Sequence, residues 1–303
     1  MNIDKELLDK LEAKWKGNEK PLPVDDDLKV QVVESLSVEE ISFLKPHEET
    51  HLIGKLRVAE GILKEKKFTW PIFADRKTGV ILDGMHRFGL LKDFCFSYIP
   101  VQHIDYVAND DIKLDVWCRY IKQVSEDEFS LVAKECGLEE VPFSTTDIME
   151  RKSAIIVSPN NRAYIFHERH SPQIEYYRLK EVEDRFSIGK KVSTGLADYN
   201  VETEALGMLN SPDTVVVFPR PLSKQDVIDV AMRGEVFPPK TTRHIFQFRV
   251  FNIEVLPTEL QATKTKKALE DAIWRAHKKR KLFYLGKGII IDRYYAEHMF
   301  RFS

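Results

Sequence analysis

The segment Val80–Arg87, which reads VILDGMHR, constrains the fold more than any other part of this chain. A short apolar run ends at Asp83, and Gly84 follows, which permits a sharp turn and lets a ligand approach the backbone closely. Met85 then begins a helical pattern. A helix that starts directly after a buried strand points its first backbone N–H groups and the positive end of its dipole at the turn. The sequence therefore predicts a strand–turn–helix unit suited to an anion such as phosphate.

Three side chains of this turn could add chemistry to it. Arg87 offers a planar guanidinium group that is always charged and fits phosphate oxygens. His86 could donate a hydrogen bond to phosphate or carry a proton. Asp83 could bind Mg²⁺ through water, orient His86 or cap the helix. The alternative is an ordinary Asp-Gly turn and helix cap, in which the histidine and arginine form a solvated first turn.

The elements around this turn predict one mixed α/β unit over about residues 30–106. An amphipathic helix is expected at the N-terminus, where Ile3, Leu7, Leu8, Leu11 and Trp15 share a face. The unit itself is expected to contain strands over residues 30–36, 70–75, 80–82 and 97–106, and a helix that carries Leu52, Leu56, Ala59, Ile62 and Leu63.

A second α/β unit is predicted from the pattern beyond about residue 150. Residues 154–166 read as a hairpin, residues 214–219 as a short buried strand, and Ser223 begins a helix that Gly234 ends. Ser125 and Glu128 form a capping box for an earlier helix. We place the first domain at residues 1–125 and the second at 126–303, with a C-terminal extension from about residue 259 and an uncertainty of several residues at each edge.

The segment Lys45–Thr50, just before the expected helix, contains a candidate general base. Phosphoryl transfer needs alignment, charge neutralisation and often a carboxylate that accepts the hydroxyl proton, a task that Glu48 could perform. Alternatively, Glu48 merely complements the positive end of the helix. The same stretch also satisfies H-E-x-x-H, the zinc protease signature, with His47 and His51 as ligands. Pro46 argues against that motif, because it places His47 at or before the start of the helix.

The loop Phe237–His244 gathers polar groups behind two prolines. Lys240, Thr242, Arg243 and His244 offer donors within a short span, which suits a carboxylate or phosphate ligand. The alternative is a solvated turn before the apolar strand that follows.

DGMHR after an apolar strand resembles the DG-x-HR signature of the ParB/sulfiredoxin-like superfamily, whose members bind nucleotide phosphates at this turn. The preceding PHEE and the following IPV strand fit the same resemblance, which covers about residues 30–106. Sulfiredoxins need a cysteine in the turn, where this chain has Met85. ParB partition proteins carry a helix-turn-helix and a basic surface, and the sequence shows neither pattern. The loop before His244 is similar to a segment of the free L-serine kinases, so we favour that family within the superfamily.

The resemblance implies a kinase that transfers the terminal phosphoryl group of ADP or ATP to free L-serine and forms O-phospho-L-serine, a product that could feed cysteine synthesis. It implies two lobes with the active site in the cleft between them. Nucleotide phosphates would lie at Asp83, Gly84, Met85, His86 and Arg87. Mg²⁺ would be held mainly by the phosphates, with Asp83 as a candidate ligand.

The resemblance also implies roles for residues distant from the turn. Glu48 would be the catalytic base, with Asp83 and His86 completing the catalytic group. Thr242 and His244 would contact the substrate, and Lys240 and Arg243 would bind its carboxylate or the phosphoryl group. Trp117 corresponds to a pocket aromatic in those enzymes, although a core tryptophan is an equally good interpretation.

Composition narrows the remaining function classes. With 46 basic and 48 acidic residues, the net charge of −2 favours neither nucleic acid nor an anionic membrane as a partner. No apolar run approaches the roughly 20 residues that span a bilayer. Three widely spaced cysteines and an N-terminus without an apolar signal core lead us to expect a cytoplasmic protein. The basic run at residues 277–281 is expected to be a solvated helix end. A kinase for another hydroxyl compound, such as a polyol, or a nucleotide-binding regulator without catalysis are the alternatives.

Overall fold

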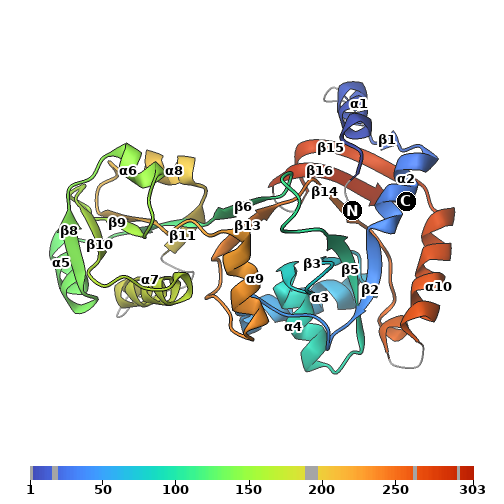
Figure 1. Ribbon diagram of the computed structural model, residues 1–303, viewed down its shortest axis with the longest axis horizontal. Helices are drawn as coiled ribbons and strands as arrows, with labels where there is room; N and C mark the ends of the chain where they lie inside the picture. The colour runs from blue at the N-terminus through green and yellow to red at the C-terminus, as the bar shows by residue number, and fades with distance from the viewer. Residues whose placement is uncertain (1–2, 16–19, 188–196, 262–264, 292–293) are drawn as a thin grey trace. The chain divides into compact units, whose positions relative to one another are not determined.

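The computed structural model describes residues 3–15, 20–187, 197–261, 265–291 and 294–303, and shows a mixed α/β protein (Figure 1). The chain divides into two compact units. Unit 1 comprises residues 1–113, 231–235 and 244–303, and unit 2 comprises residues 114–230 and 236–243. The two boundaries near residues 113 and 243 fall inside strands β6 (Lys113–Val116) and β13 (Thr242–Ile245), which form a two-stranded sheet.

Unit 1 contains two four-stranded sheets, with the strand orders β2-β5-β3-β4 and β1-β15-β16-β14. The strands of the first sheet are β2 (Leu36–Glu40), β3 (Ile72–Asp75), β4 (Ile81–Asp83) and β5 (Tyr98–Ile104). The strands of the second sheet are β1 (Leu22–Pro23), β14 (Phe248–Phe251), β15 (Leu282–Ile290) and β16 (Tyr294–Phe302). The helices of unit 1 are α1 (Lys5–Trp15), α2 (Asp26–Glu34), α3 (Leu52–Glu65), α4 (Met85–Asp93), the 3-10 helix η1 (Pro257–Leu260) and α10 (Lys266–Lys279).

Both ends of the chain take part in unit 1. Helix α1 contacts β15 and helix α10 contacts both α2 and β2, so N-terminal and C-terminal segments lie side by side (Figure 1). The side-chain amide of Gln102 on β5 bonds to the backbone of β14 on both sides, to Phe248 O at 3.3 Å and from Val250 N at 3.2 Å. These bonds tie the two sheets together inside the core.

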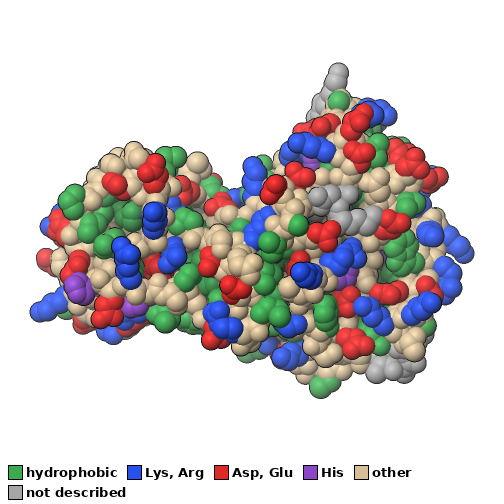
Figure 2. Space-filling model, in the orientation of Figure 1, with side chains coloured by type: hydrophobic (Ala, Val, Ile, Leu, Met, Phe, Trp, Pro, Cys, Tyr) green, Lys and Arg blue, Asp and Glu red, His purple; other side chains and the backbone are tan. Residues whose placement is uncertain are grey.

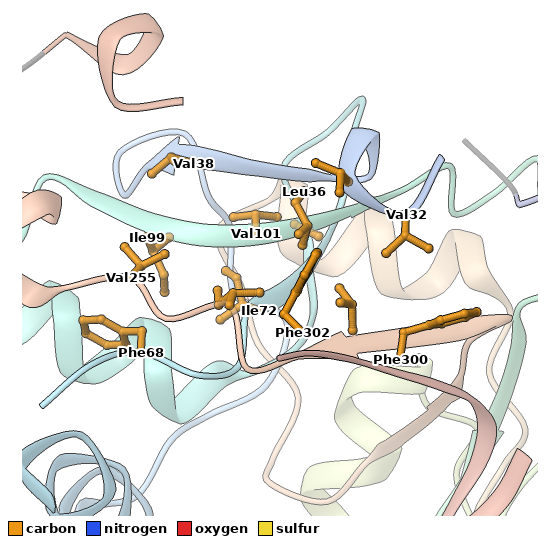
Figure 3. Packing of buried hydrophobic residues seen from close by; sticks show 14 of the residues in the cluster. Val32, Leu36, Val38, Phe68, Ile72, Ile99, Val101, Val255, Phe300 and Phe302 are labelled. Carbon is orange, nitrogen blue, oxygen red and sulfur yellow. The ribbon is translucent and has the colours of Figure 1, made fainter. Parts of the chain in front are cut away.

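The C-terminal strand β16 belongs to the core of the first unit. Phe300 and Phe302 are fully buried in the same apolar cluster as Ile72 and Val101 (Figure 3). Residues 244–303 therefore pack with the N-terminal part of the chain. The compact units thus differ from the predicted domain limits of 1–125 and 126–303, because the aromatic face of β16 is buried against strands that lie some 200 residues earlier, a pairing that no local pattern reveals.

Unit 2 is built on a six-stranded sheet with the order β11-β7-β12-β9-β10-β8, in which neighbouring strands run antiparallel. Its strands are β7 (Cys118–Lys122), β8 (Leu138–Val141), β9 (Ile155–Val157), β10 (Ala163–Phe166), β11 (Ala197–Asn200) and β12 (Thr214–Phe218). Its helices are α5 (Glu126–Glu135), α6 (Thr145–Met149), α7 (Pro172–Ser187) and α8 (Glu202–Gly207), and α9 (Lys224–Met232) ends across the boundary.

Most predicted elements are confirmed, and one is wrong. Residues 30–36 were expected to form a strand, but Val30 to Val33 lie in helix α2, and the strand begins only at Leu36. Asp25 caps this helix by accepting a hydrogen bond from Leu28 N, and Leu28 and Val32 are buried at helical spacing. Tertiary packing and the cap thus override the strand preference of the valines.

Two surface expectations can be compared with the structure. Among the helices that the structure describes, none is both long and apolar enough to cross a membrane. The basic run closes helix α10, as expected, with Lys278 and Lys279 exposed and His277 buried. On the face seen in Figure 2, acidic and basic side chains are interspersed rather than gathered by sign.

Candidate active site

The predicted strand–turn–helix unit is present: β4 ends at Asp83, Gly84 makes the turn and α4 begins at Met85. Gly84 has φ 99° and ψ 23°, and a Cβ atom there would lie 2.6 Å from Ile72 Cγ2. Only glycine fits this position without strain. Gly84, the N-cap of α4, has no side chain that could cap the helix, and the first turn contains no acidic residue. The backbone at the start of α4 therefore suits an anion.

Two arginines flank the carboxylate of Asp83 in unit 1. Arg249 Nη1 lies 2.5 Å from Asp83 Oδ2, whereas Arg87 Nη2 lies 3.8 Å from Asp83 Oδ1. The Asp83 side chain is about one-quarter exposed. Asp83 therefore serves as a partner for guanidinium groups, and the N-cap position of α4 is occupied by Gly84.

Arg249 and its partners were not identified from the sequence. Its side chain is 5% exposed, and Nε donates to Glu297 Oε1 at 2.7 Å. Although burial acts to lower the pKa of Arg249, the neighbouring carboxylates of Asp83 and Glu297 raise it above its ordinary value. One signal was available in the sequence, since Arg249 interrupts the apolar run of β14, and a charge within such a strand indicates a buried partner.

The segment that carries Glu48 runs beside β4. Lys45 N donates to Gly79 O and Ile81 N donates to Lys45 O, both at 2.9 Å, and the bridge between Lys45 and Val80 is parallel. Beyond this bridge, Glu48 and Asp83 both lie near the buried ring of His47, whose pKa is lowered mainly by burial and raised in part by each of these two carboxylates. The Glu48 side chain is 14% exposed. The structure thus brings two segments that were singled out separately in the sequence to the same end of β4.

His47 fixes this segment rather than joining a metal site. Its Nδ1 donates to Ile81 O at 2.5 Å, and the ring is fully buried. Burial lowers the pKa of His47 below the ordinary 6.5, although Glu48 acts in the opposite direction. His51 caps α3 by accepting from Gly54 N at 3.0 Å. The two histidines therefore do not share a helix face, and the prediction that His47 lies before the start of the helix is confirmed. The described residues contain no group of three or more His, Cys, Asp or Glu that could hold a metal.

His86 points toward the start of α3. Its ring centroid lies 4.5 Å from that of His51, and a Cβ atom on Gly54 would lie 2.1 Å from His86 Cδ2. The glycine at position 54 therefore makes room for the ring. The contacts of His86 hold two helix N-termini together, and its predicted catalytic role stays a prediction.

His244 of unit 1 lies in a buried aromatic group. Tyr106 Oη lies 2.8 Å from His244 Nε2, the other side of the ring bonds to the carbonyl of Leu82, and the ring makes an edge contact with His47 at 5.5 Å. A carbonyl only accepts, so Nδ1 carries the proton and the tyrosine donates to Nε2. Burial holds the pKa of His244 well below its ordinary value, with the nearby His47 acting in the same direction. The predicted substrate contact of His244 stays a prediction.

In unit 2, three of the predicted substrate residues meet. Lys240 Nζ and the Arg243 guanidinium lie 5.4 and 5.5 Å from the ring centroid of Trp117. Arg243 also pairs with Asp115 at 3.1 Å, with both side chains partly exposed. Trp117 is half-buried, so its ring is neither a core side chain nor a fully exposed one. Thr242, the fourth residue, is 9% exposed.

No protein-family model matches the chain. The chain is similar to an "ATP-dependent L-serine kinase" of Staphylothermus marinus, with 26% identity over 69% of this chain and 84% of the relative. It is also similar to the "ADP-dependent L-serine kinase SerK" of Thermococcus kodakarensis, with 27% identity over 73% of this chain and 91% of the relative. A "ParB-like protein" of Sulfolobus acidocaldarius is 26% identical over 68% of this chain and 88% of its own length.

Solved structures agree with these sequence relatives. A free serine kinase in complex with AMP superimposes with a TM-score of 0.61 and 23% identity, over 75% of this chain and 93% of the other. SbnI of Staphylococcus aureus with a C-terminal truncation gives a TM-score of 0.65 and 17% identity, over 82% and 98%. The predicted mixed α/β fold class is confirmed, and the fold is similar to those of the free serine kinase and SbnI. Within that class, the predicted resemblance to the free L-serine kinases is also confirmed.

Proposed function

We propose that this protein is a phosphotransferase that moves the terminal phosphoryl group of ADP or ATP to the hydroxyl group of free L-serine. The observation that supports the proposal is that Glu48 and Asp83 both lie near the ring of His47, and that Asp83 directly precedes Gly84, the N-cap of α4. A phosphate site and a candidate base thus share one end of β4. The homologues named ATP- and ADP-dependent L-serine kinases support serine as the acceptor and leave both donors open.

The proposed reaction assigns one task to each group of the turn. Backbone N–H groups at the start of α4 and the guanidinium of Arg87 bind the nucleotide phosphates. The serine hydroxyl oxygen forms a bond to the terminal phosphorus while the bond to the bridging oxygen breaks. The hydroxyl proton passes to the carboxylate of Glu48. The products are O-phospho-L-serine and either AMP or ADP, according to the donor.

Mg²⁺ fits this site as an ion carried mainly by the nucleotide phosphates, where it would neutralise charge that develops on their oxygens. Asp83 is the candidate protein ligand. Both of its oxygens face guanidinium groups, at 2.5 and 3.8 Å. That arrangement favours a contact through water over direct coordination.

The proposed acceptor site uses the predicted residues of the second loop. Lys240 and Arg243 offer two cations for the serine carboxylate, and Thr242 offers a hydroxyl group. Trp117 holds both cations against its ring, which limits the directions they can take. His244 is buried behind Leu82, and its bond from Tyr106 supports a role in shaping the site.

The test is a reaction of the purified protein with Mg²⁺, either ADP or ATP, and a panel of hydroxyl metabolites that includes L-serine, L-threonine, glycerol and inositol. The proposal predicts a phosphorylated product from L-serine, detected by mass, with AMP or ADP formed in equal amount. Phosphorylation of a polyol alone would assign a different acceptor. Nucleotide binding without any phosphorylated product would identify a regulator and end the proposal.

A further inference from the structure

A buried arginine of unit 2 holds the backbone of two predicted acceptor residues. Arg119 lies on β7, and its side chain is 2% exposed. Its Nη1 donates to the carbonyl oxygen of Trp117 at 2.5 Å, and its Nη2 donates to the carbonyl oxygen of Lys240 at 3.3 Å, 121 residues further along the chain. One guanidinium group therefore joins the two segments whose side chains meet where the Lys240 ammonium lies over the Trp117 ring.

A carboxylate and two aromatic rings fix the guanidinium of Arg119. Its Nε donates to Glu183 Oε1 at 2.6 Å, and the Glu183 side chain is 7% exposed. Tyr199 Oη donates to the other oxygen of this carboxylate at 3.1 Å. The rings of Tyr176 and Tyr199 lie 5.8 and 5.4 Å from the guanidinium. All three nitrogens of the planar group thus donate in fixed directions, which leaves it little freedom to turn.

The charge of this arginine is secure in spite of its burial. Burial acts to lower the pKa of Arg119, but the neighbouring Glu183 carboxylate raises it above its ordinary value. A charged guanidinium forms stronger hydrogen bonds to carbonyl oxygens than a neutral donor does. Arg119 is therefore suited to hold backbone segments in place.

The two carbonyl groups belong to backbone that benefits from such support. Lys240 has φ 62°, in the left-handed region that residues with a Cβ atom adopt only rarely. Trp117 lies between the end of β6 and the start of β7, where the strand is interrupted. A bond to each carbonyl from one rigid side chain fixes the spacing of the two segments, and with it the place of the ammonium over the indole ring.

A second buried arginine of unit 2 makes a similar set of bonds to other segments. The Arg151 side chain is 2% exposed and pairs with Glu202 at 2.6 Å. It donates to the carbonyl oxygens of Pro219 and Ile148, both at 2.6 Å. Arg151 thus matches Arg119 in burial, in its glutamate partner and in its two carbonyl partners, but it bonds to neither Trp117 nor the loop at 237–244 through these groups.

We propose that Arg119 is a positioning residue of the acceptor site, which holds the carbonyl groups of Trp117 and Lys240 and so sets the place of the cations that bind the carboxylate of L-serine. A fixed backbone reduces the conformational freedom that these cations lose when they bind a carboxylate. The assignment rests on the proposed function, because it assumes that Lys240 and Arg243 bind the carboxylate of the acceptor.

The main test compares Arg119→Lys with the matched control Arg151→Lys. Each variant keeps a positive charge near its glutamate but loses the planar fork that reaches two carbonyl groups. Arg119→Lys should raise the KM for L-serine by about 3- to 10-fold, with a smaller change in kcat and an ADP dissociation constant within a factor of about two. Arg151→Lys should leave the KM for L-serine unchanged, although both variants lower the melting temperature. An unchanged KM in a folded Arg119→Lys protein, or an equal rise in both variants, would overturn the proposal.

A spectroscopic measurement separates this proposal from the proposed function. The chain has four tryptophans, so fluorine NMR of the full protein labelled with 5-fluorotryptophan gives a small set of signals, and Trp117→Phe identifies the signal of Trp117. That signal should shift or broaden in Arg119→Lys and stay unchanged in Arg151→Lys. No change in Arg119→Lys would overturn the proposal. If the wild-type protein does not phosphorylate L-serine, the proposed function fails, whereas this comparison still decides whether Arg119 fixes Trp117.

A milder variant covers the case in which Arg119→Lys does not fold. Tyr199→Phe removes the hydroxyl group that donates to Glu183, and so loosens the carboxylate that orients Arg119. The KM for L-serine should rise about twofold, and the Trp117 signal should broaden. Tyr164→Phe removes a hydroxyl group bonded to Glu140 at 3.4 Å in the same unit and is the control. A KM and a Trp117 signal that both stay unchanged in Tyr199→Phe would contradict the positioning role.

Discussion

The phosphate turn of unit 1 and the cationic loop of unit 2 hold their arginines in opposite ways. Arg249 behind the turn is 5% exposed, paired with two carboxylates and enclosed by aromatic rings. Arg243 in the loop is 21% exposed, pairs with Asp115, which is 37% exposed, and lies over the ring of Trp117. Buried charges interact more strongly than exposed ones, because water screens them less. The turn is therefore expected to be rigid and sensitive to substitution, and the loop adaptable and tolerant.

The largest effect is expected from Glu48→Gln. The variant keeps the size of the side chain but cannot accept the hydroxyl proton, so turnover of L-serine should fall by about 100-fold or more. ADP affinity, measured by calorimetry, should stay within a factor of about two, since the phosphate groups of the turn are intact. Glu49→Gln, at the exposed neighbouring position, is the matched control and should retain turnover. Normal turnover in Glu48→Gln would remove Glu48 from the mechanism.

Arg87→Ala should produce the next largest effect. It removes a charge-assisted contact to phosphate, which is worth about 1.5–3 kcal/mol, so ADP should bind about 10- to 100-fold more weakly. The measurement is titration calorimetry with ADP at fixed ionic strength. Arg57→Ala, an exposed position on α3, serves as the control for a lost arginine charge. Equal affinity in the Arg87 and Arg57 variants would show that Arg87 does not bind the nucleotide.

A pH effect on stability should follow from the buried histidines. Burial lowers the pKa values of His47 and His244 below the ordinary 6.5. Between the lowered pKa of each histidine and 6.5, the unfolded chain binds more protons than the folded one. The contribution of the neutral, buried histidine to the free energy of unfolding is therefore complete above about pH 6.5. It is lost as the pH falls towards the lowered pKa. Each histidine should contribute about 1.4 kcal/mol per pH unit in that window.

Thermal or denaturant unfolding between pH 5 and pH 8 measures this slope. A stability that does not change from pH 7 to pH 5.5 would contradict the burial of both rings.

The smallest effect is expected in the loop of unit 2. Lys240→Ala removes a cation that lies over Trp117 at the surface, so the KM for L-serine should rise only about two- to fivefold, with the ADP affinity unchanged. Steady-state kinetics with varied serine gives the value. Lys122→Ala, whose ammonium lies over the ring of Tyr120 in the same unit, is the control. If Lys240→Ala raised the KM for L-serine as strongly as Arg87→Ala is expected to weaken ADP binding, the expected difference in sensitivity between the loop and the turn would be wrong.

Local sequence patterns were enough to locate the turn and the strands beside it. Gly84 indicates the turn in the sequence. In the structure its φ is 99° and Ile72 lies so close that a residue with a Cβ atom would be strained at this position. The strand–turn–helix order around it follows from the alternation of apolar runs and turn formers. Glu48 was singled out as the candidate base because it is a carboxylate just before the expected helix and because of the resemblance to the serine kinases, and that role stays a prediction.

The features that the sequence did not predict depend on packing between segments far apart in the chain. Arg249 pairs with Asp83, and Glu297 with Arg249, from strands far along the chain, and no sequence periodicity indicates that β16 packs in unit 1. Tyr106, which donates to His244, was missed for the same reason. The valines of α2 predicted a strand, because their intrinsic preference is local, whereas the burial that makes them helical is not.

The most direct test of the central claim is a crystal structure of the protein with ADP and Mg²⁺. Our account predicts phosphate oxygens within hydrogen-bond distance of the backbone N–H groups that begin α4 and of the Arg87 guanidinium, with Arg249 still bound to Asp83. A nucleotide whose phosphates lie away from this turn would contradict it.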